Sequence, residues 1–244
     1  MNFQSILVPA LAGTLILGGC SANGDNTNAP VAAQGPGGVT VEADISASTP
    51  FMASPAYTDA AVKRVGEAVM KQRPGDRFRI VPIGDRSVAN SIQTFAMASS
   101  QKVHQRTVRK QMEAALTSLF AEQRNKGGNG STNILYGLQN SHPLCNAGSV
   151  IFVLSDGMEA SSEADVGAAL ATGKLVKLPE PSQPFLKGGC SIWMIGIGVA
   201  AQSGNGTSVQ TLPDDQLQRL TTAWRSWFVA AGADPDKVHF ETIL

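Results

Sequence analysis

Charged residues are scarce in this chain of 244 residues: 19 Lys and Arg and 19 Asp and Glu give a formal net charge of zero. The missing basic excess argues against a nucleic-acid partner, and the missing acidic run argues against a solvating tail. Three histidines without ligand spacing argue against a histidine-rich zinc site. What is present is a hydrophobic fraction of 43%, enough for one domain with a full core or for two small ones.

The N-terminal segment contains no charged residue over positions 5–19, and it ends in small residues, as a secretory signal does. The apolar run is short for a bilayer span and stops at Cys20 after Leu-Gly-Gly at 17–19. This pattern resembles the lipobox of bacterial lipoproteins. The resemblance implies a signal peptide over 1–19 and acylation of Cys20, whose lipid would hold the chain on a membrane without a transmembrane helix.

The start of the segment departs from that pattern, because residues 1–4 carry no Lys or Arg. An ordinary cleaved signal and a start codon placed too late are the alternatives. Ser21 follows the cysteine, and similarity to enterobacterial sorting rules then favours the outer membrane, with the protein in the cell envelope and facing the periplasm or the surface. Residues 20–38 are small, polar and rich in Pro and Gly, which predicts a flexible tether before a domain over 39–244.

Strand and helix patterns alternate along residues 39–244. Two nearly continuous apolar runs are typical of strands buried on both faces of a parallel sheet. The alternation predicts an open, doubly wound, mostly parallel α/β sheet flanked by helices. The expected strands are 39–44, 78–83, 91–97 (a short edge strand), 149–154, 191–197 and 238–242, and the expected helices are 58–72, 102–123, 133–140, 162–173 and 214–231.

Oxygen-bearing side chains cluster at the ends of two predicted strands and in one loop. Ligands of such sheets bind beyond the carboxyl ends of the strands. The residues concerned are Asp44, Ser46 and Ser48 after the first strand, Thr132 before a short helix, and Asp156 after a hydrophobic strand.

This order resembles the metal-ion-dependent adhesion site (MIDAS) of the von Willebrand factor A (VWA) family, whose pattern is Asp-x-Ser-x-Ser, then a threonine, then an aspartate. The resemblance spans residues 39–244 and implies a VWA or Rossmann-like fold. It implies one bound Mg²⁺, or Mn²⁺ or Ca²⁺, with Ser46, Ser48 and Thr132 as neutral ligands and Asp44 and Asp156 holding waters. With few anionic ligands the ion would stay electrophilic and accept an Asp or Glu from a partner protein.

Each part of the pattern has a plainer interpretation. Serines near an aspartate cap helices, Gly-Ser-Thr-Asn starts a helix and Ser-Asp-Gly is a turn. A degenerate, metal-free copy of the site is a further alternative. The family's domain usually ends in a helix after the last strand, and we expect the domain of this chain to lack that helix. The loop 49–57 after the first strand carries Phe51, Met52 and Tyr57, which we expect to pack against loop 200–212 rather than to contact a partner.

Cys145 and Cys190 come shortly before the two apolar strands. In the family's sheet these strands are parallel neighbours, which places both cysteines on the edge opposite the metal. An extracytoplasmic compartment permits oxidation, so we expect a Cys145–Cys190 disulfide, with two buried thiols as the alternative.

The expected function is therefore a membrane-anchored, cation-dependent protein-binding module for adhesion or assembly. A structural subunit of an envelope secretion or conjugation machine, with the metal only stabilising the fold, is the alternative. An enzyme is not expected, because the chain lacks a Gly-x-Ser-x-Gly elbow and a Gly-x-Gly-x-x-Gly after the first strand. No small-molecule substrate and no nucleic-acid partner are expected either.

Overall fold

The computed structural model describes residues 37–84, 93–96, 102–128, 130–202 and 208–243. The predicted signal peptide, Cys20 and the predicted tether up to residue 36 lie outside these residues. Within the described part, no helix is both long and apolar enough to cross a membrane.

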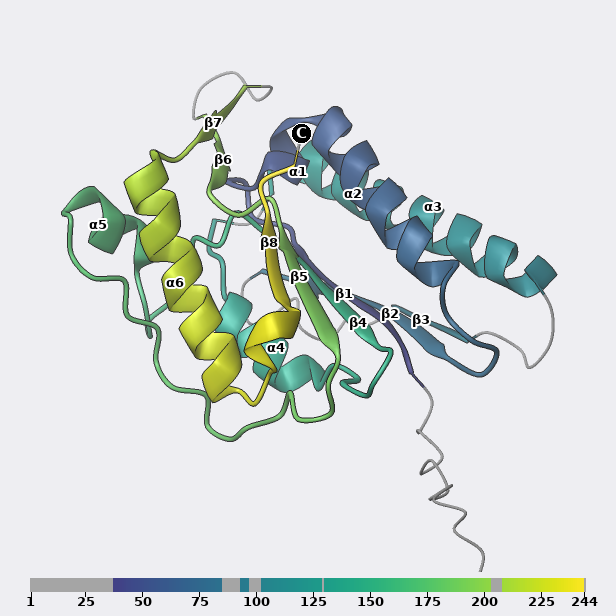
Figure 1. Cartoon of the computed structure of the whole chain (residues 1–244). Coiled ribbons are helices and arrows are strands. Elements are labelled where there is room, and N and C mark those ends of the chain that lie inside the picture. Colours follow the sequence, from purple (N-terminus) through teal and green to yellow (C-terminus); the bar gives the residue numbers. More distant parts are fainter. Residues whose placement is uncertain (1–36, 85–92, 97–101, 129, 203–207, 244) are drawn as a thin grey trace, which may run out of the picture. The chain divides into compact units, whose positions relative to one another are not determined.

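A six-stranded sheet forms the centre of the domain, in the order β3-β2-β1-β4-β5-β8 (Figure 1). All neighbouring strands are parallel except β3, which runs antiparallel to β2 at one edge. The predicted doubly wound, mostly parallel α/β fold is confirmed. The strands are β1 (Gly38–Asp44), β2 (Arg77–Ile83), β3 (Gln93–Ala96), β4 (Val150–Leu154), β5 (Ser191–Ile195) and β8 (Val238–Glu241).

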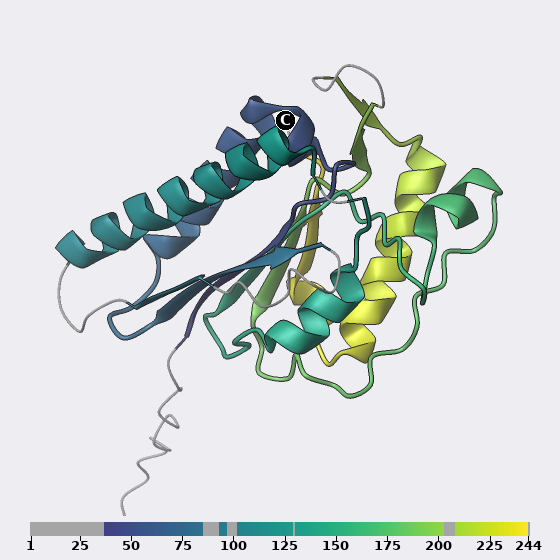
Figure 2. The ribbon, with the colours of Figure 1, turned by 180° about the vertical axis from the view of Figure 1, so that it is seen from behind.

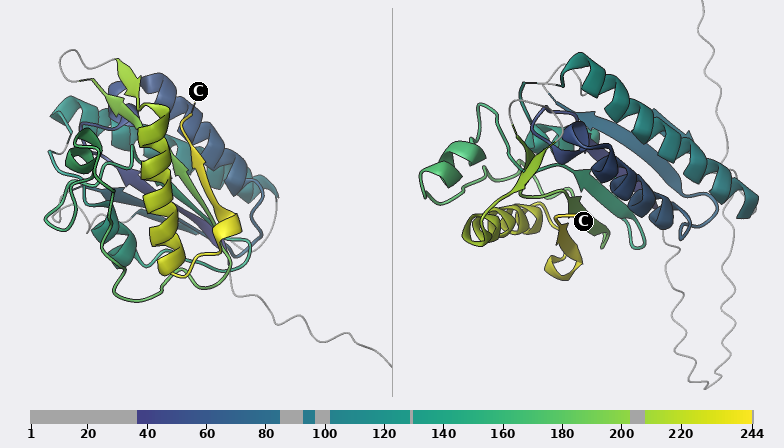
Figure 3. Two further views of the ribbon diagram at one scale, coloured as in Figure 1. Left: turned by 60° about the vertical axis from the view of Figure 1, so that its left-hand side comes forward. Right: turned by 90° about the horizontal axis from the view of Figure 1, so that it is seen from above.

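Helices lie on both sides of this sheet, as Figures 2 and 3 show from behind, from the side and from above. One side carries α1 (Pro50–Ala53), α2 (Pro55–Val69) and α3 (Lys102–Lys126), and the other carries α4 (Ile134–Ser141), α5 (Val166–Ala171) and α6 (Asp214–Ala230). A small hairpin of β6 (Val199–Ala201) and β7 (Val209–Thr211) and a 3₁₀ turn (Pro235–Lys237) complete the described elements.

The sheet separates two apolar clusters. Val41 and Ala43 of β1 point into the cluster under α1, α2 and α3, whereas Ile151 and Val153 of β4 point into the cluster under α4, α5 and α6. Side chains alternate along a strand, so Asp44, next to Ala43, projects from the α4 side of β1. Burial on both faces explains why β4 is continuously apolar in sequence.

The segment predicted as a loop over 49–57 is helical, which corrects the sequence analysis. Pro50 and Pro55 stand at the first turns of α1 and α2, where a missing N–H costs nothing. Phe51 is fully buried and its ring lies 5.5 Å from that of Phe120 on α3. Phe51 therefore packs inside the domain, as expected. Its neighbours in the apolar cluster include α3 as well as Val199 of the β6–β7 hairpin. Arg124 of α3 donates to the carbonyls that end α1.

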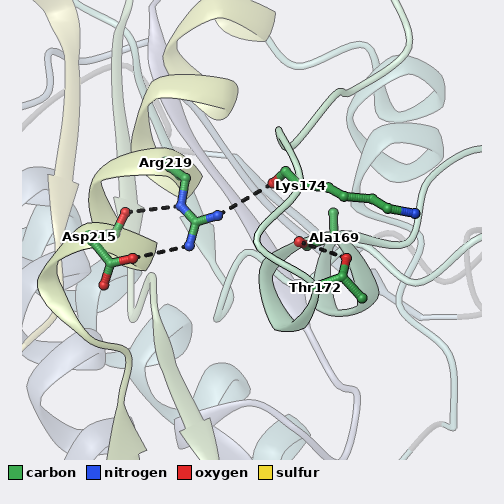
Figure 4. Close-up of polar contacts among 5 residues, drawn as sticks. All are labelled: Ala169, Thr172, Lys174, Asp215 and Arg219. Carbon is green, nitrogen blue, oxygen red and sulfur yellow. Dashed lines mark hydrogen bonds and ion pairs between the residues drawn. The ribbon is translucent and has the colours of Figure 1, made fainter.

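Helix α5 is shorter than the predicted 162–173. Its N-cap is Asp165, whose carboxylate accepts the Ala168 N–H at 2.8 Å. At its other end, the Thr172 hydroxyl donates to the carbonyl of Ala169 at 3.3 Å, and Arg219 of α6 donates to the carbonyl of Lys174 at 3.4 Å (Figure 4). Arg219 also donates to Asp215 one turn earlier at 3.1 Å, so this arginine joins α6 to the chain that leaves α5.

Cys145 and Cys190 form a disulfide with their Cα atoms 4.8 Å apart, which confirms the predicted pairing. Cys190 immediately precedes β5, and Cys145 precedes β4 by a short turn. The bridge therefore fastens the amino ends of two parallel neighbours. The opposite, carboxyl edge of the sheet is left for the side chains described next.

Candidate metal centre

The carboxyl ends of β1 and β4 mark the switch point of the sheet. The strands are direct neighbours, but strand order continues toward β2 from one and toward β5 from the other. Connections leaving such a pair diverge, which opens a crevice where ligands of α/β sheets bind. Asp44 is the last residue of β1, and Ser155 and Asp156 follow β4 directly. Two of the predicted site residues therefore meet at the point where the topology itself favours a ligand.

The two aspartates are both completely buried, and hydrogen bonds fix each of them. Asp44 Oδ1 accepts the N–H of Ser46 at 2.9 Å, and Asp44 Oδ2 accepts the hydroxyl of Ser155 at 2.7 Å. Asp156 Oδ1 accepts the N–H of Met158 at 2.9 Å. Among the described residues, nothing hydrogen-bonds to the buried Asp156 Oδ2. Buried carboxylate oxygens normally have a hydrogen-bond partner, so this oxygen stands out as one that can accept a further contact.

Two hydroxyls accompany the aspartates. The Oγ atoms of Ser46 and Ser48 lie 3.2 Å apart on the loop that follows β1. That loop is held by the Ala201 N–H, which donates to the Ser48 carbonyl at 2.7 Å, and by the Thr49 hydroxyl, which donates to the Ser46 carbonyl at 3.3 Å. These two hydrogen bonds hold the loop in place, and with it the positions of both serine residues.

Burial dominates the electrostatics of the pair. It raises the pKa of Asp44 to about 7; the charge of Asp156 adds to the rise, and hydrogen bonds from Ser155 and Ser46 oppose it. Burial likewise raises the pKa of Asp156, and the hydrogen bond from the Met158 N–H opposes the rise. When two carboxylates lie close together, the charge of one disfavours ionisation of the other.

Thr132 reaches this edge from a different part of the chain. It is buried on the loop between α3 and α4, and it forms a bridge with Ala160, whose N–H donates to the Thr132 carbonyl at 3.0 Å. Ala160 lies four residues after Asp156. The structure therefore pairs Thr132 with the chain that follows Asp156.

Gly157 explains how the chain turns away after Asp156. Its φ is +78°, a conformation that favours glycine, and its carbonyl accepts the indole N–H of Trp224 at 2.9 Å. A Cβ here would lie 3.2 Å from both Ile197 Cγ1 and Trp224 Nε1. The positive φ and the close approach of α6 both favour glycine at this position.

The donor set fits a hard cation better than a soft one. In the described part of the chain, no three His, Cys, Asp or Glu side chains gather closely enough to hold a metal by themselves. An ion at this edge would thus depend on the hydroxyls of Ser46, Ser48 and Thr132 as well as on the aspartates. Oxygen ligands of this kind suit Mg²⁺, Mn²⁺ or Ca²⁺.

Two residues near the site were not singled out from sequence. Ser155 binds Asp44 and also accepts the Gly157 N–H at 3.0 Å, so its hydroxyl joins the two strand ends. Glu159 is completely buried and bonds to the first turn of α4. The only sequence signal for either is its closeness to Asp156, because burial by distant elements decides both roles.

Comparison with known proteins adds little to this geometry. No family model and no curated protein matches the sequence. Among solved structures, the chain is similar to the crystal structure of an aerotolerance-related membrane protein from Bacteroides fragilis NCTC 9343 with multiple mutations to serines. The similarity has a TM-score of 0.40 and 14% sequence identity, and it covers 84% of this chain and 90% of that chain. A similarity this low transfers no function, so the function rests on the site itself.

Proposed function

We propose that the domain binds one divalent cation, Mg²⁺ in the first instance, and through it an acidic residue of a partner protein. The observation that carries this proposal is the buried Asp156 Oδ2 without a hydrogen-bond partner, next to Asp44 and on the same edge as the Ser46 and Ser48 hydroxyls. An uncompensated pair of buried carboxylates is costly, and a bound cation removes that cost.

The ligand set determines what the ion would do. Ser46, Ser48 and Thr132 would supply neutral oxygens, and Asp44 and Asp156 would hold its waters through hydrogen bonds. Such an ion retains most of its charge and so attracts a further carboxylate. A Glu or Asp side chain of another protein is the natural source, because Mg²⁺ is commonly bound through one or two carboxylates and keeps exchangeable waters.

We infer the place of action from the sequence of the N-terminal segment. Acylation of Cys20 would hold the domain in the cell envelope, with residues 20–38 as a tether. The disulfide supports an oxidising compartment, since such bridges persist outside the cytoplasm. We expect neither catalysis nor a small-molecule or nucleic-acid ligand.

Cation binding is tested first, by calorimetry with Mg²⁺ and Mn²⁺ on the purified protein. We expect saturable binding that Ser48→Ala and Asp156→Asn each weaken by tenfold or more, on the order of 1.4 kcal/mol or above. Matched controls are Ser226→Ala on α6 and Asp236→Asn, an exposed residue before β8 at the amino edge of the sheet. Absence of binding by the folded wild-type protein would contradict the proposal.

Partner recognition is tested by capture from envelope extract with and without EDTA. EDTA-sensitive capture that Asp156→Asn also abolishes supports the adhesion or assembly role. Cation binding combined with capture that persists in EDTA favours the alternative, a structural subunit of an envelope secretion or conjugation machine in which the metal only stabilises the fold.

A further inference from the structure

Glu159 is a buried acid close to the candidate metal centre but outside its five predicted residues. Its side chain is completely buried, three positions after Asp156. Its Oε2 accepts the backbone N–H of Ile134 at 2.7 Å and that of Leu135 at 3.2 Å. These are the first two residues of α4, whose N–H groups have no partner within the helix.

We propose that Glu159 is a positioning residue that holds Thr132 at the cation site; this inference rests on the proposed function. Thr132 lies two residues before Ile134, and its own carbonyl accepts the Ala160 N–H at 3.0 Å. The Thr132 segment is therefore fastened on both sides, by Ala160 and by Glu159. Both contacts come from the chain that follows Asp156, so they set the distance between these two parts of the site.

Helix capping alone does not explain a glutamate at this position. Asn133 already caps α4 locally, because its side chain accepts the Tyr136 N–H at 3.3 Å. Glu159 comes from 25 and 24 residues away, and its buried Oε1 has no hydrogen-bond partner in the part of the chain that the structure describes. A buried charge is an expensive way to cap a helix. The value of Glu159 lies in spanning two loops; burial raises its pKa, and the hydrogen bonds from the Ile134 and Leu135 N–H groups oppose that rise.

The first test requires no metal. Hydrogen exchange is measured in EDTA on the peptide covering residues 132–138, for wild type, Glu159→Ala, Glu159→Gln and the exposed control Glu180→Ala. The alanine variant removes both acceptor bonds, so exchange in this peptide should rise by tenfold or more, on the order expected when a local hydrogen bond is lost. The glutamine variant retains a carbonyl oxygen for both N–H groups and should stay close to wild type.

The second test asks whether Glu159 acts through Thr132. We expect Glu159→Ala to weaken Mg²⁺ affinity by about 10- to 100-fold, as removal of an outer partner of a metal ligand does. Glu159→Gln should restore most of the affinity. In a Thr132→Ala background, Glu159→Ala should cost little more, because coupled residues are not additive.

Each outcome decides the matter. Unchanged exchange in Glu159→Ala, or fully additive losses in the double variant, overturns the inference while leaving the proposed function standing. A wild-type protein that binds no Mg²⁺ overturns the proposed function, and the exchange experiment still shows whether Glu159 holds the Thr132 segment. If Glu159→Ala does not fold, Glu159→Asp replaces it: the shorter side chain cannot reach both amides, and it too should raise exchange over residues 132–138.

Discussion

Glu42 offers a sharp test of the electrostatics of this fold. It lies in the middle of β1, completely buried, and neither of its carboxylate oxygens has a hydrogen-bond partner among the described residues. Burial raises its pKa from 4.5 to about 8, although the charge of Arg79 opposes the rise. Arg79 is engaged elsewhere, since it donates to the carbonyls of Ser141 and His142 at the end of α4.

The expected effect on stability has a definite sign. Between pH 4.5 and about 8 the unfolded chain has released the Glu42 proton while the folded protein retains it. The free energy of unfolding should therefore fall as the pH rises through this window and level off above pH 8. A difference of about 3.5 between the two pKa values corresponds to a loss of about 5 kcal/mol at ~1.4 kcal/mol per pKa unit.

Glu42→Gln keeps the shape of the side chain and removes this titration. We expect wild type and variant to be similar in stability near pH 5 and the variant to be more stable by several kcal/mol near pH 9. Urea unfolding in EDTA across this range measures the difference in free energy of unfolding between the two proteins. Asp44 titrates in both proteins, so its contribution cancels in that difference. Glu122→Gln, an exposed residue on α3, is the control. Stability curves that stay parallel from pH 5 to 9 would refute the reasoning.

Two further perturbations test the disulfide and the turn after the central strand. Replacing Cys145 and Cys190 by alanine opens a loop closed across 45 residues, which should lower the free energy of unfolding by about 4 kcal/mol. Equal urea midpoints with and without reductant would contradict this expectation. Gly157→Ala places a Cβ 3.2 Å from Ile197 and Trp224 at a φ of +78°, so we expect the free energy of unfolding to fall by about 1–3 kcal/mol. An unchanged melting temperature would show that the turn relaxes freely.

The secondary structure was predictable wherever local pattern and burial agree. The apolar runs at 149–154 and 191–197 contain β4 and β5, and the periodic segments 102–123 and 214–231 correspond closely to α3 and α6. A strand that is buried on both faces has a continuous apolar run, and a helix that is buried on one face has apolar residues at helical spacing. Such elements can therefore be predicted without knowing which elements pack against them.

Short elements were missed for an equally physical reason. Residues 50–53 form one helical turn and β6 and β7 have three residues each, too few for any period to show. Helix α5 begins only at Val166 because Asp165 caps it and because Ala160 pairs with both Thr132 and Asp165. These boundaries depend on contacts with distant chain segments, which override local propensity.

The sequence by itself determined which oxygen-bearing residues follow which strands. Only the tertiary structure decided that β1 and β4 are neighbours, so that Asp44 and Asp156 lie at the same edge, how both are buried, and that Ser155 and Glu159 join the surrounding loops. The physical reason is that local patterns predict where strands begin and end, whereas strand pairing, desolvation and hydrogen bonding depend on every element packed around a group. Glu42 and Glu159 look like ordinary acids in the sequence, and the fold alone makes them buried ones.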